Sequence, residues 1–459
     1  MHKYTTNANA NPQTTMQRLR STLVAAVVAV ACVLLLQPLF VASLVFVKSH
    51  TDLGPVRRAI AHGFENGALS ADEAPRSIIY RFGHQFTECV ALQIAIDSEQ
   101  DPLTIALVPK LSSPFINAEP CAELQDDISG HHDKERYDYG RYWHGYRLYL
   151  WPMLEYTELV TMRYVNGVLI FACVVALFLA LRGTIGATPA AALVIVLLSL
   201  TDIWRIWAIT PHFISTAWIL GGSAMFATCY NRWPGLVTTV ALAAVLGAVF
   251  NFIDFLINPP MMPMFLAFIV LAVRLGDAPA LGRAETIDAL WWAGAVALAW
   301  FGGYALTWIT KWVLAAWISA DDVRTGTTIL NQILLRLYGH EPGEPVPIML
   351  LRPTIKMIGQ AFISAGSIVV AILAAAIFLN LRGHWASFDF RRFLLLSSPT
   401  LIPVFWFELL SSHTQTHSHF TYRSEAAAIA IVFAAALMAM PVKVTLKQLL
   451  GGLRRRGAA

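Results

Sequence analysis

Long apolar runs recur along this chain, and they constrain its possible folds more than any other feature. The first run, residues 23–47, has 25 residues, whereas about 20 residues of helix suffice to cross the hydrocarbon core of a bilayer. It follows a basic tail with Lys3, Arg18 and Arg20 and ends without a small-residue cleavage site, so we interpret it as a retained span. With 56% apolar and 14% charged residues, the composition excludes a soluble globular protein of this size.

The runs predict an all-α polytopic membrane protein with about ten transmembrane helices and a long first periplasmic loop. If both termini are cytoplasmic, the inner segments hold 15 basic residues against 4 acids, in agreement with the positive-inside rule. The predicted parts are a cytoplasmic tail (1–22), a first span (23–47), a periplasmic loop domain (48–158), a transmembrane bundle (159–310), a second periplasmic loop (311–356), a second bundle (357–442) with an outer turn (411–424), and a basic cytoplasmic tail (443–459).

The outer turn at residues 411–424 is rich in ionisable side chains. It contains His413, His417, His419, Tyr422 and Arg423, although a connection between two spans needs only turn residues. Ionisable groups at a bilayer are functional candidates because they are costly unless paired; a polar cap that keeps the hairpin in water is the alternative. The spacing of His413 and His417 suits metal binding on a helix, but the neighbouring Ser and Thr favour a loop, so we predict no metal site.

The long outer loop supplies two candidate catalytic bases. Glu88 lies near the start of the string FTECVALQIAI (86–96). We expect the apolar part of this string at the membrane face, where partial burial raises the proton affinity of a carboxylate; a solvated loop acid is the alternative. Asp52 follows the first span in the string HTDLG (50–54), and its alternatives are a helix N-cap and an exposed turn acid.

A second string in this loop holds candidate ligands for a phosphate group. Arg141, His144 and Arg147 alternate with aromatic residues in RYWHGYR (141–147), and Arg163 lies at the start of the second span. Arginine binds phosphate through its bidentate fork. An aromatic belt at the membrane interface is the structural alternative for this string.

Asn251 and Asp254 lie at the end of the fifth run, just before Asn258, Pro259 and Pro260. Prolines leave backbone groups unpaired, which a membrane tolerates only against protein or a water-filled cavity. We therefore predict a re-entrant turn in which Asn251 and Asp254 line a cavity, with an ordinary loop as the alternative.

The cysteines and the missing motifs narrow the biochemical classes. Cys89 and Cys121 share the long outer loop, so they can form a disulfide if that loop faces an oxidising compartment. Cys32, Cys173 and Cys229 lie in apolar runs and are interpreted as small core residues. The sequence has no Walker loop and no dinucleotide-binding fingerprint, which argues against ATP as the energy source. No nucleic-acid partner is predicted.

Four strings carry a resemblance to known proteins. FTECVAL (86–92), RYWHGYR (141–147), IDFLINP (253–259) and the outer-turn pattern from His413 to Arg423 resemble blocks of bacterial integral membrane proteins associated with surface-polysaccharide synthesis. The arrangement as a whole resembles the GT-C superfamily of membrane glycosyltransferases, and its plan is similar to that of periplasm-facing arabinofuranosyltransferases that modify pilins or cell-wall polymers. In many members of the superfamily paired acids follow the first span, whereas Asp52 has no acid beside it; we therefore prefer Glu88 as the base.

The resemblance implies a GT-C-like fold in the bacterial inner membrane with an active site facing the periplasm. The implied function is inverting transfer of a sugar, with a pentose such as arabinofuranose among the candidates, from a polyprenyl-phosphate donor. The acceptor would be a glycan, a lipid-linked species or a protein such as a pilin, and membrane lipids surround the site. A divalent cation at the donor phosphate stays an open alternative, and a flippase or transporter of polyprenyl-linked glycans is the alternative function. The implied donor-binding residues are Arg141, His144, Arg147, Arg163, His413, His417, Tyr422 and Arg423, with Glu88 or else Asp52 as the base.

Overall fold

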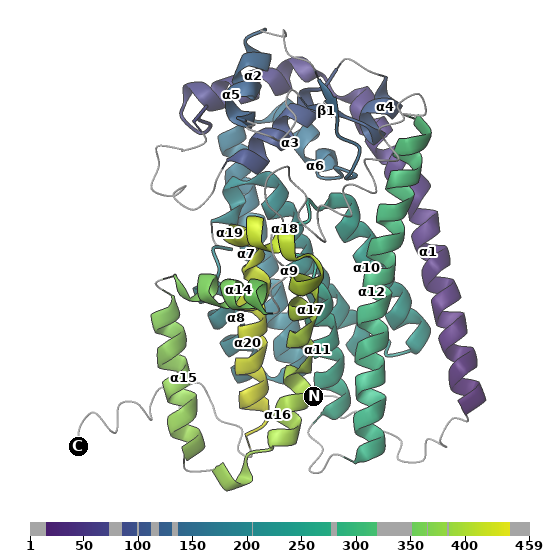
Figure 1. Cartoon of the computed structure of the whole chain (residues 1–459), viewed down its shortest axis with the longest axis vertical. Helices are drawn as coiled ribbons and strands as arrows, with labels where there is room; N and C mark the ends of the chain where they lie inside the picture. The colour runs from purple at the N-terminus through teal and green to yellow at the C-terminus, as the bar shows by residue number, and fades with distance from the viewer. Residues whose placement is uncertain are drawn as a thin grey trace.

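A computed structural model shows a long helical bundle that carries a layer of short helices at one end (Figure 1). The structure describes residues 15–72, 85–98, 101–111, 119–130, 136–203, 205–276, 282–318, 351–364, 366–382 and 385–440. Over these ranges the prediction of an all-α polytopic membrane protein is confirmed. The basic tail predicted at residues 443–459 lies outside the described residues.

Seven described segments are long and apolar enough to cross a membrane. A pair of helices joined by a 96° bend, α14 and α15, forms an eighth if the two count as one span. Length and hydropathy therefore support seven or eight of the ten predicted spans. Five of the seven segments are single helices: α1 (Thr15–His50), α7 (Leu159–Ile185), α9 (Thr210–Arg232), α10 (Leu236–Ile253) and α12 (Arg283–Ile318). The other two are composite: α16 (Phe390–Ser397), η4 (Ser398–Thr400) and α17 (Leu401–Leu409) form one, and α19 (Ser418–Thr421) and α20 (Arg423–Met438) form the other. The bent pair consists of α14 (Arg352–Phe362) and α15 (Ser367–Arg382), and η3 (Trp385–Ser387) lies between α15 and α16.

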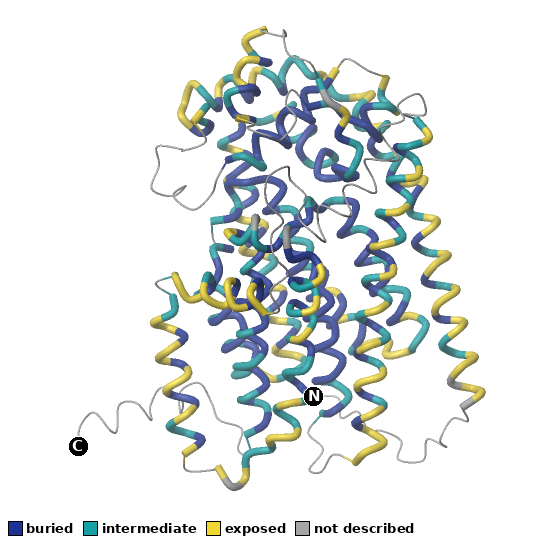
Figure 2. Tube along the Cα trace, viewed as in Figure 1, coloured by how far each residue is buried: buried dark blue, intermediate teal, exposed yellow. Residues whose placement is uncertain are grey.

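The third and sixth predicted spans form shorter helices, α8 (Ala187–Leu200) and α11 (Met261–Leu275). Their 14 and 15 residues fall short of the ~20 that a perpendicular crossing requires. Every residue from Met261 to Ala272 is buried, as expected for a helix that is apolar on all sides. Helix α11 is thus a core element of the bundle, and Figure 2 shows the buried residues concentrated around it.

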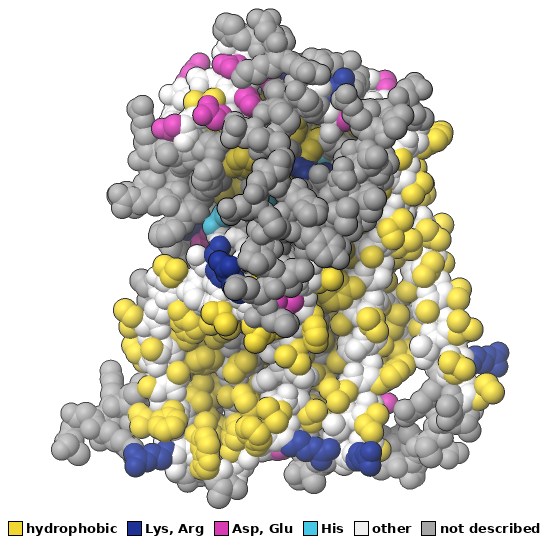
Figure 3. All heavy atoms as spheres, viewed as in Figure 1, with side chains coloured by type: hydrophobic (Ala, Val, Ile, Leu, Met, Phe, Trp, Pro, Cys, Tyr) yellow, Lys and Arg dark blue, Asp and Glu magenta, His cyan; other side chains and the backbone are white. Residues whose placement is uncertain are grey.

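The layer at the end of the bundle, called the head domain here, comprises described residues between 51 and 156. Its elements are α2 (Leu53–Glu65), α3 (Phe86–Ile96), α4 (Pro102–Leu107), β1 (Lys110–Leu111), α5 (Pro120–Ile128), β2 (Tyr137–Asp138) and α6 (Arg147–Tyr156). The strands form one short antiparallel ladder, and the predicted disulfide between Cys89 and Cys121 joins α3 to α5. On the visible face, acidic side chains gather on the head domain and basic ones at the opposite end (Figure 3).

Two sequence-based expectations about this architecture were wrong, and helix α12 runs to Ile318, past the boundary predicted at residue 310. The apolar string after Glu88 does not lie against the membrane, because α2, α5, α6 and α9 surround α3 and bury every residue from Glu88 to Ile96. The outer turn is helical, since backbone bonds such as His417 N to His413 O (3.0 Å) form α18 (Ser411–Thr416) and α19.

Candidate functional site

Several of the polar residues selected from the sequence, among them Glu88, Arg163 and Arg423, lie around the first turn of α9, where the bundle meets the head domain. Residues 202–203 and 205–209, which include η2 (Ile206–Ala208), precede α9. Helix α3 of the head domain contacts α9, and α18 and α19 lie beneath the head domain (Figure 1). This end of α9 therefore brings together segments from three distant parts of the sequence.

Glu88 is fully buried and binds directly to the start of α9. Its carboxylate accepts hydrogen bonds from the Thr210 backbone N (2.6 Å) and from Thr210 Oγ1 (2.9 Å). Burial raises the pKa of Glu88, while Arg163 and the two bonds from Thr210 oppose this rise. The solvated-loop alternative is excluded because Glu88 has no exposed surface. A carboxylate at this position also stabilises α9, since its negative charge lies at the positive end of the helix dipole.

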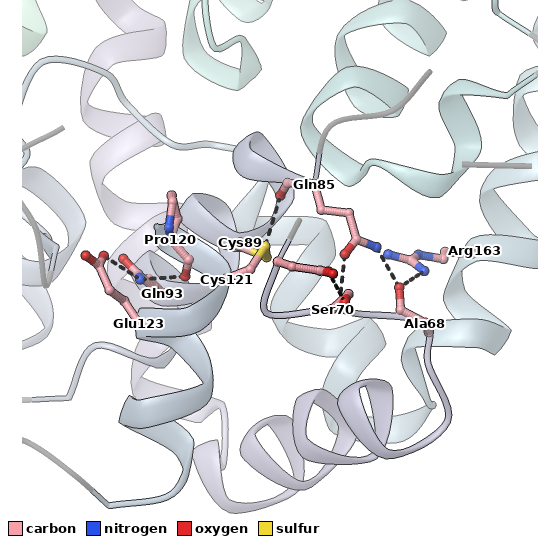
Figure 4. Close-up of a disulfide and its surroundings, with 10 residues drawn as sticks. Ala68, Ser70, Gln85, Cys89, Gln93, Pro120, Cys121, Glu123 and Arg163 are labelled. Carbon is pink, nitrogen blue, oxygen red and sulfur yellow. Dashed lines mark hydrogen bonds between the residues drawn. A yellow bond between two sulfur atoms is a disulfide. The ribbon is translucent and has the colours of Figure 1, made fainter. Parts of the chain in front are cut away.

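Arg163, from the first turns of α7, lies close to this carboxylate. Its Nη1 donates to the Ala68 carbonyl (2.9 Å), and the same carbonyl accepts a bond from Gln85 Nε2 (2.7 Å). Figure 4 shows these groups beside the disulfide, whose Cys121 sulfur contacts the Gln85 carbonyl. Arg163 therefore supplies a buried positive charge next to Glu88 and also holds the end of α2 against α7.

On the other side of the same helix start, Arg423 is bound to a protein carboxylate. Its Nε and Nη2 donate to the two oxygens of Asp202 (2.6 and 2.8 Å), and Tyr422 donates to Asp202 as well (3.2 Å). Burial raises the pKa of Asp202, but the charge and hydrogen bonds of Arg423 lower this pKa by more than burial raises it. The pKa of Asp202 is therefore below its usual value. The bidentate face of Arg423 is thus occupied by Asp202 rather than presented to a phosphate.

His212 occupies the second position after Thr210, and one of its ring nitrogens has no partner among the described residues. Arg423 Nη1 lies 3.1 Å from His212 Nδ1. Because a guanidinium only donates, Nδ1 must accept this bond, and the neutral ring then carries its proton on Nε2. This Nε2 is buried and unbonded within the described part of the chain. His212 therefore offers a buried donor that no described protein group uses.

The histidines of the outer turn lie in contact with one another next to this position. The rings of His413 and His417 lie 4.6 Å apart, and His417 stacks on Phe420 at 5.3 Å. His413 Nε2 is 3.0 Å from the Leu256 carbonyl, and His212 contacts Phe420 edge-on at 5.1 Å. Among the residues that the structure describes, no group of three or more His, Cys, Asp or Glu is arranged to hold a metal ion.

Asp254 lies in the buried turn between α10 and α11, next to Ser215 in the second turn of α9. Its carboxylate accepts from Ser215 Oγ (2.7 Å) and from the Ile257 backbone N (3.2 Å). Burial raises the pKa of Asp254 to about 7, although these hydrogen bonds oppose the rise. Asn251, one turn earlier, has a buried Oδ1 without a partner in the described residues. The turn is therefore enclosed by protein, and the predicted cavity beside it stays a prediction.

The string RYWHGYR joins the head domain to the bundle, because Trp143 Nε1 donates to the Thr307 carbonyl (2.9 Å) and the Gly145 backbone N to the Phe252 carbonyl (2.8 Å). Arg147 is fully buried and donates to the carbonyls of Ile105 (2.8 Å), Ala106 (3.0 Å) and His144 (3.2 Å). Burial lowers the pKa of His144 well below its usual value, so this ring is neutral at physiological pH. The Arg141 guanidinium lies over the Tyr139 ring at 4.4 Å. Of the phosphate ligands predicted here, Arg147 thus donates from all three of its nitrogens to protein carbonyls.

Asp52 is separated from this group of residues. It is exposed and caps α2, accepting a hydrogen bond from the Gly54 backbone N (2.8 Å). The helix N-cap that was the alternative for Asp52 is what the structure shows.

Sequence reasoning did not select Thr210, His212, Ser215 or Asp202 as functional residues. Asp202 and His212 flank one short polar segment between apolar runs, and that interruption was the available signal. Ser215 and Thr210 carry no local signal because their partners, Asp254 and Glu88, lie 39 and 122 residues away in sequence. Comparisons with protein-family models, curated proteins and solved structures find no match for this chain.

Proposed function

We propose that this protein is a membrane glycosyltransferase that moves a sugar from a polyprenyl-phosphate donor to an acceptor hydroxyl. One observation carries the proposal: a buried carboxylate, Glu88, and a buried donor to which no described residue bonds, His212 Nε2, flank Thr210 at the start of α9. Such a pair provides a base for an incoming hydroxyl and a hydrogen-bond donor for a departing phosphate.

The proposed reaction is a single displacement at the anomeric carbon. The acceptor hydroxyl attacks this carbon from the face opposite the phosphate, its proton passes to Glu88, and the bond between sugar and phosphate breaks. The anomeric configuration is therefore inverted. Each oxygen of Glu88 already accepts one bond from Thr210, and the second lone pair of either oxygen is left to accept the hydroxyl.

The departing phosphate keeps the electron pair of the broken bond and needs hydrogen-bond donors. His212 Nε2 supplies one, and the neighbouring His413 and His417 supply others when protonated. Arg423 acts indirectly in this scheme, because its bond to Nδ1 selects the His212 tautomer that donates from Nε2. Since Glu88 has no exposed surface, the reaction also requires the head domain to open for the acceptor.

We also propose a membrane topology for the chain. Ten helical segments cross the bacterial inner membrane, both termini lie in the cytoplasm, and the head domain faces the periplasm. The disulfide in the head domain supports this orientation because disulfides persist in oxidising compartments. The basic side chains at the opposite end of the bundle, seen in Figure 3, fit a cytoplasmic face.

The test is transfer from polyprenyl-phosphate sugars in membranes that contain the full chain. Glu88→Gln keeps the shape of the side chain but cannot take a proton, so we expect transfer to fall by roughly 10²–10⁴-fold while donor binding persists. His212→Ala should weaken both donor binding and transfer. Asp52→Asn is the matched control, because Asn also caps helices, and it should keep full activity.

The results separate the competing functions. If Glu88→Gln keeps activity and Asp52→Asn loses it, the base assignment is wrong although the enzyme class stands. If the unmodified protein consumes no polyprenyl sugar but moves polyprenyl-linked glycans across vesicles, the flippase alternative is correct. The 96° bend between α14 and α15 favours that alternative, since broken helices are common in transporters.

A further inference from the structure

An apolar groove lies between α1, α10 and α12, at the end of the bundle away from the head domain. It encloses about 660 Å³. Its walls come from residues between Thr22 and Val33 of α1, between Leu236 and Ala244 of α10, and between Trp291 and Leu306 of α12. All three helices are membrane-spanning candidates, so hydrocarbon rather than water surrounds the groove.

The groove has the shape of a wedge that is closed towards the head domain. At the closed end Gln37 Nε2 donates to Thr307 Oγ1 (3.1 Å) and links α1 to α12. Just beyond, Phe40 of α1 stacks on Phe252 of α10 at 4.1 Å. From this contact α1 leans away from α12 towards its own N-terminus (Figure 1). The wedge therefore opens towards the end of the bundle opposite the head domain.

Two glycines of α12 leave space in the groove that no described part of the chain fills. A Cβ atom added to Gly303 would overlap the Ala244 carbonyl, so Gly303 is needed for the close contact of α12 with α10. In contrast, a Cβ atom at Gly294 or Gly302 would meet nothing within 4 Å of the described residues. Glycine inside a helix is less stable than alanine, and packing against α1 or α10 does not account for these two glycines. A molecule that occupies the groove would account for them.

The surroundings identify the chemistry of that occupant. Empty apolar cavities exclude water and accept apolar ligands. A helix, about 10 Å across, cannot follow a wedge that narrows until Gln37 and Thr307 touch, whereas a single hydrocarbon chain can. At the open end, directly before α10, the exposed Arg232 lies over the Trp233 ring at 5.3 Å. A cation and an exposed tryptophan are the groups that bind lipid headgroups at an interface.

We propose that an acyl chain of an anionic phospholipid occupies this groove and joins α1 to α12, with its phosphate beside Arg232. The lipid comes from the leaflet opposite the head domain. It is distinct from the polyprenyl-phosphate donor proposed above, whose phosphate would lie at His212, beyond the closed end of the wedge. The bound lipid does not depend on the proposed enzyme activity, because it contacts only α1, α10, α12 and Arg232 at the end of α9, none of which the proposed reaction uses.

The test uses the purified full chain with phosphatidylglycerol that carries a photoreactive diazirine in one acyl chain. In the unmodified protein we expect labelling concentrated in residues 22–33, 236–244 and 291–306. Gly302→Leu fills the groove and should lose this labelling, together with the lipid that native mass spectrometry detects. Gly183→Leu is the matched control, since Gly183 of α7 is also exposed and has nothing within 4 Å of an added Cβ, and it should label normally.

Three results would overturn the proposal. Labelling spread evenly over all lipid-facing helices would show that the groove holds no particular chain. Undiminished labelling in Gly302→Leu would place the lipid elsewhere. A dimer that dissociates in Gly302→Leu would show that the groove is an interface between two copies of the chain. The label map of the unmodified protein decides the first point even if Gly302→Leu fails to fold.

Discussion

The buried ion pair between Asp202 and Arg423 joins two segments that are 221 residues apart in sequence. Its side chains are only 17% and 4% exposed. When one partner of such a pair is removed, the other charge stays buried without compensation, at a cost of about 3–5 kcal/mol. We therefore expect Asp202→Asn and Arg423→Gln each to destabilise the protein strongly.

The double variant measures the interaction itself. With Asn at 202 and Gln at 423, neither position carries a charge, so the penalty for an isolated buried charge disappears. We expect the double variant to be less destabilised than the sum of the two single variants, by about 2–3 kcal/mol. Thermal unfolding of the four proteins, followed by tryptophan fluorescence in the same lipid–detergent mixture, gives this comparison.

The pair also predicts a pH dependence with a definite sign. The pKa of Asp202 is lowered below 3.8 in the folded protein, so its stabilising contribution is present above the unfolded pKa and is lost as the pH falls through the folded pKa. The difference in melting temperature between the unmodified protein and Asp202→Asn should therefore shrink at acidic pH. Additive effects of the two single variants, or a difference that grows in acid, would refute the reasoning.

Three further predictions concern the head domain and the turn after α10. Cys89→Ser should destabilise the head domain by roughly 3–4 kcal/mol from the loop entropy of a bridge spanning 32 residues, and Cys121 should become available to thiol labelling without reductant. Because the pKa of Asp254 is raised to about 7, stability should fall as the pH rises from about 4 to 7; Asp254→Asn should remove this fall, and Asp52→Asn should not. Arg147→Met should lower the melting temperature markedly, since three carbonyls lose a charged donor; an unchanged melting temperature with lost transfer would instead restore its predicted role at a phosphate.

The local sequence pattern was sufficient to predict the features that depend on residues close together in the sequence. The span of α1 follows from its apolar run because its exposed side chains face hydrocarbon whatever the rest of the chain does. The Cys89–Cys121 pair could be anticipated because both residues share the one long hydrophilic loop. The cap at Asp52 was recognisable as an alternative, since the bond to Gly54 spans only two residues.

Roles that depend on distant partners could not be read in this way. In the sequence Arg147, Arg163 and Arg423 look alike, as cations near the ends of spans. In the fold Arg147 binds the carbonyls of α4, Arg163 lies beside Glu88, and Arg423 is held by Asp202. Which partner a guanidinium meets is decided by helix packing, because the partners come from different helices.

The amino-acid sequence by itself determined that this is a multi-pass helical membrane protein with a folded head domain and ionisable groups near it. The physical reason is the solvent: an apolar helix of about 20 residues is stable in the hydrocarbon core of a bilayer and not in water. Only the tertiary structure decided that Glu88 is buried against Thr210 while Asp52 is exposed. Burial depends on which helices surround a side chain. The packing of α3 on α9 depends on contacts between residues more than a hundred positions apart in sequence.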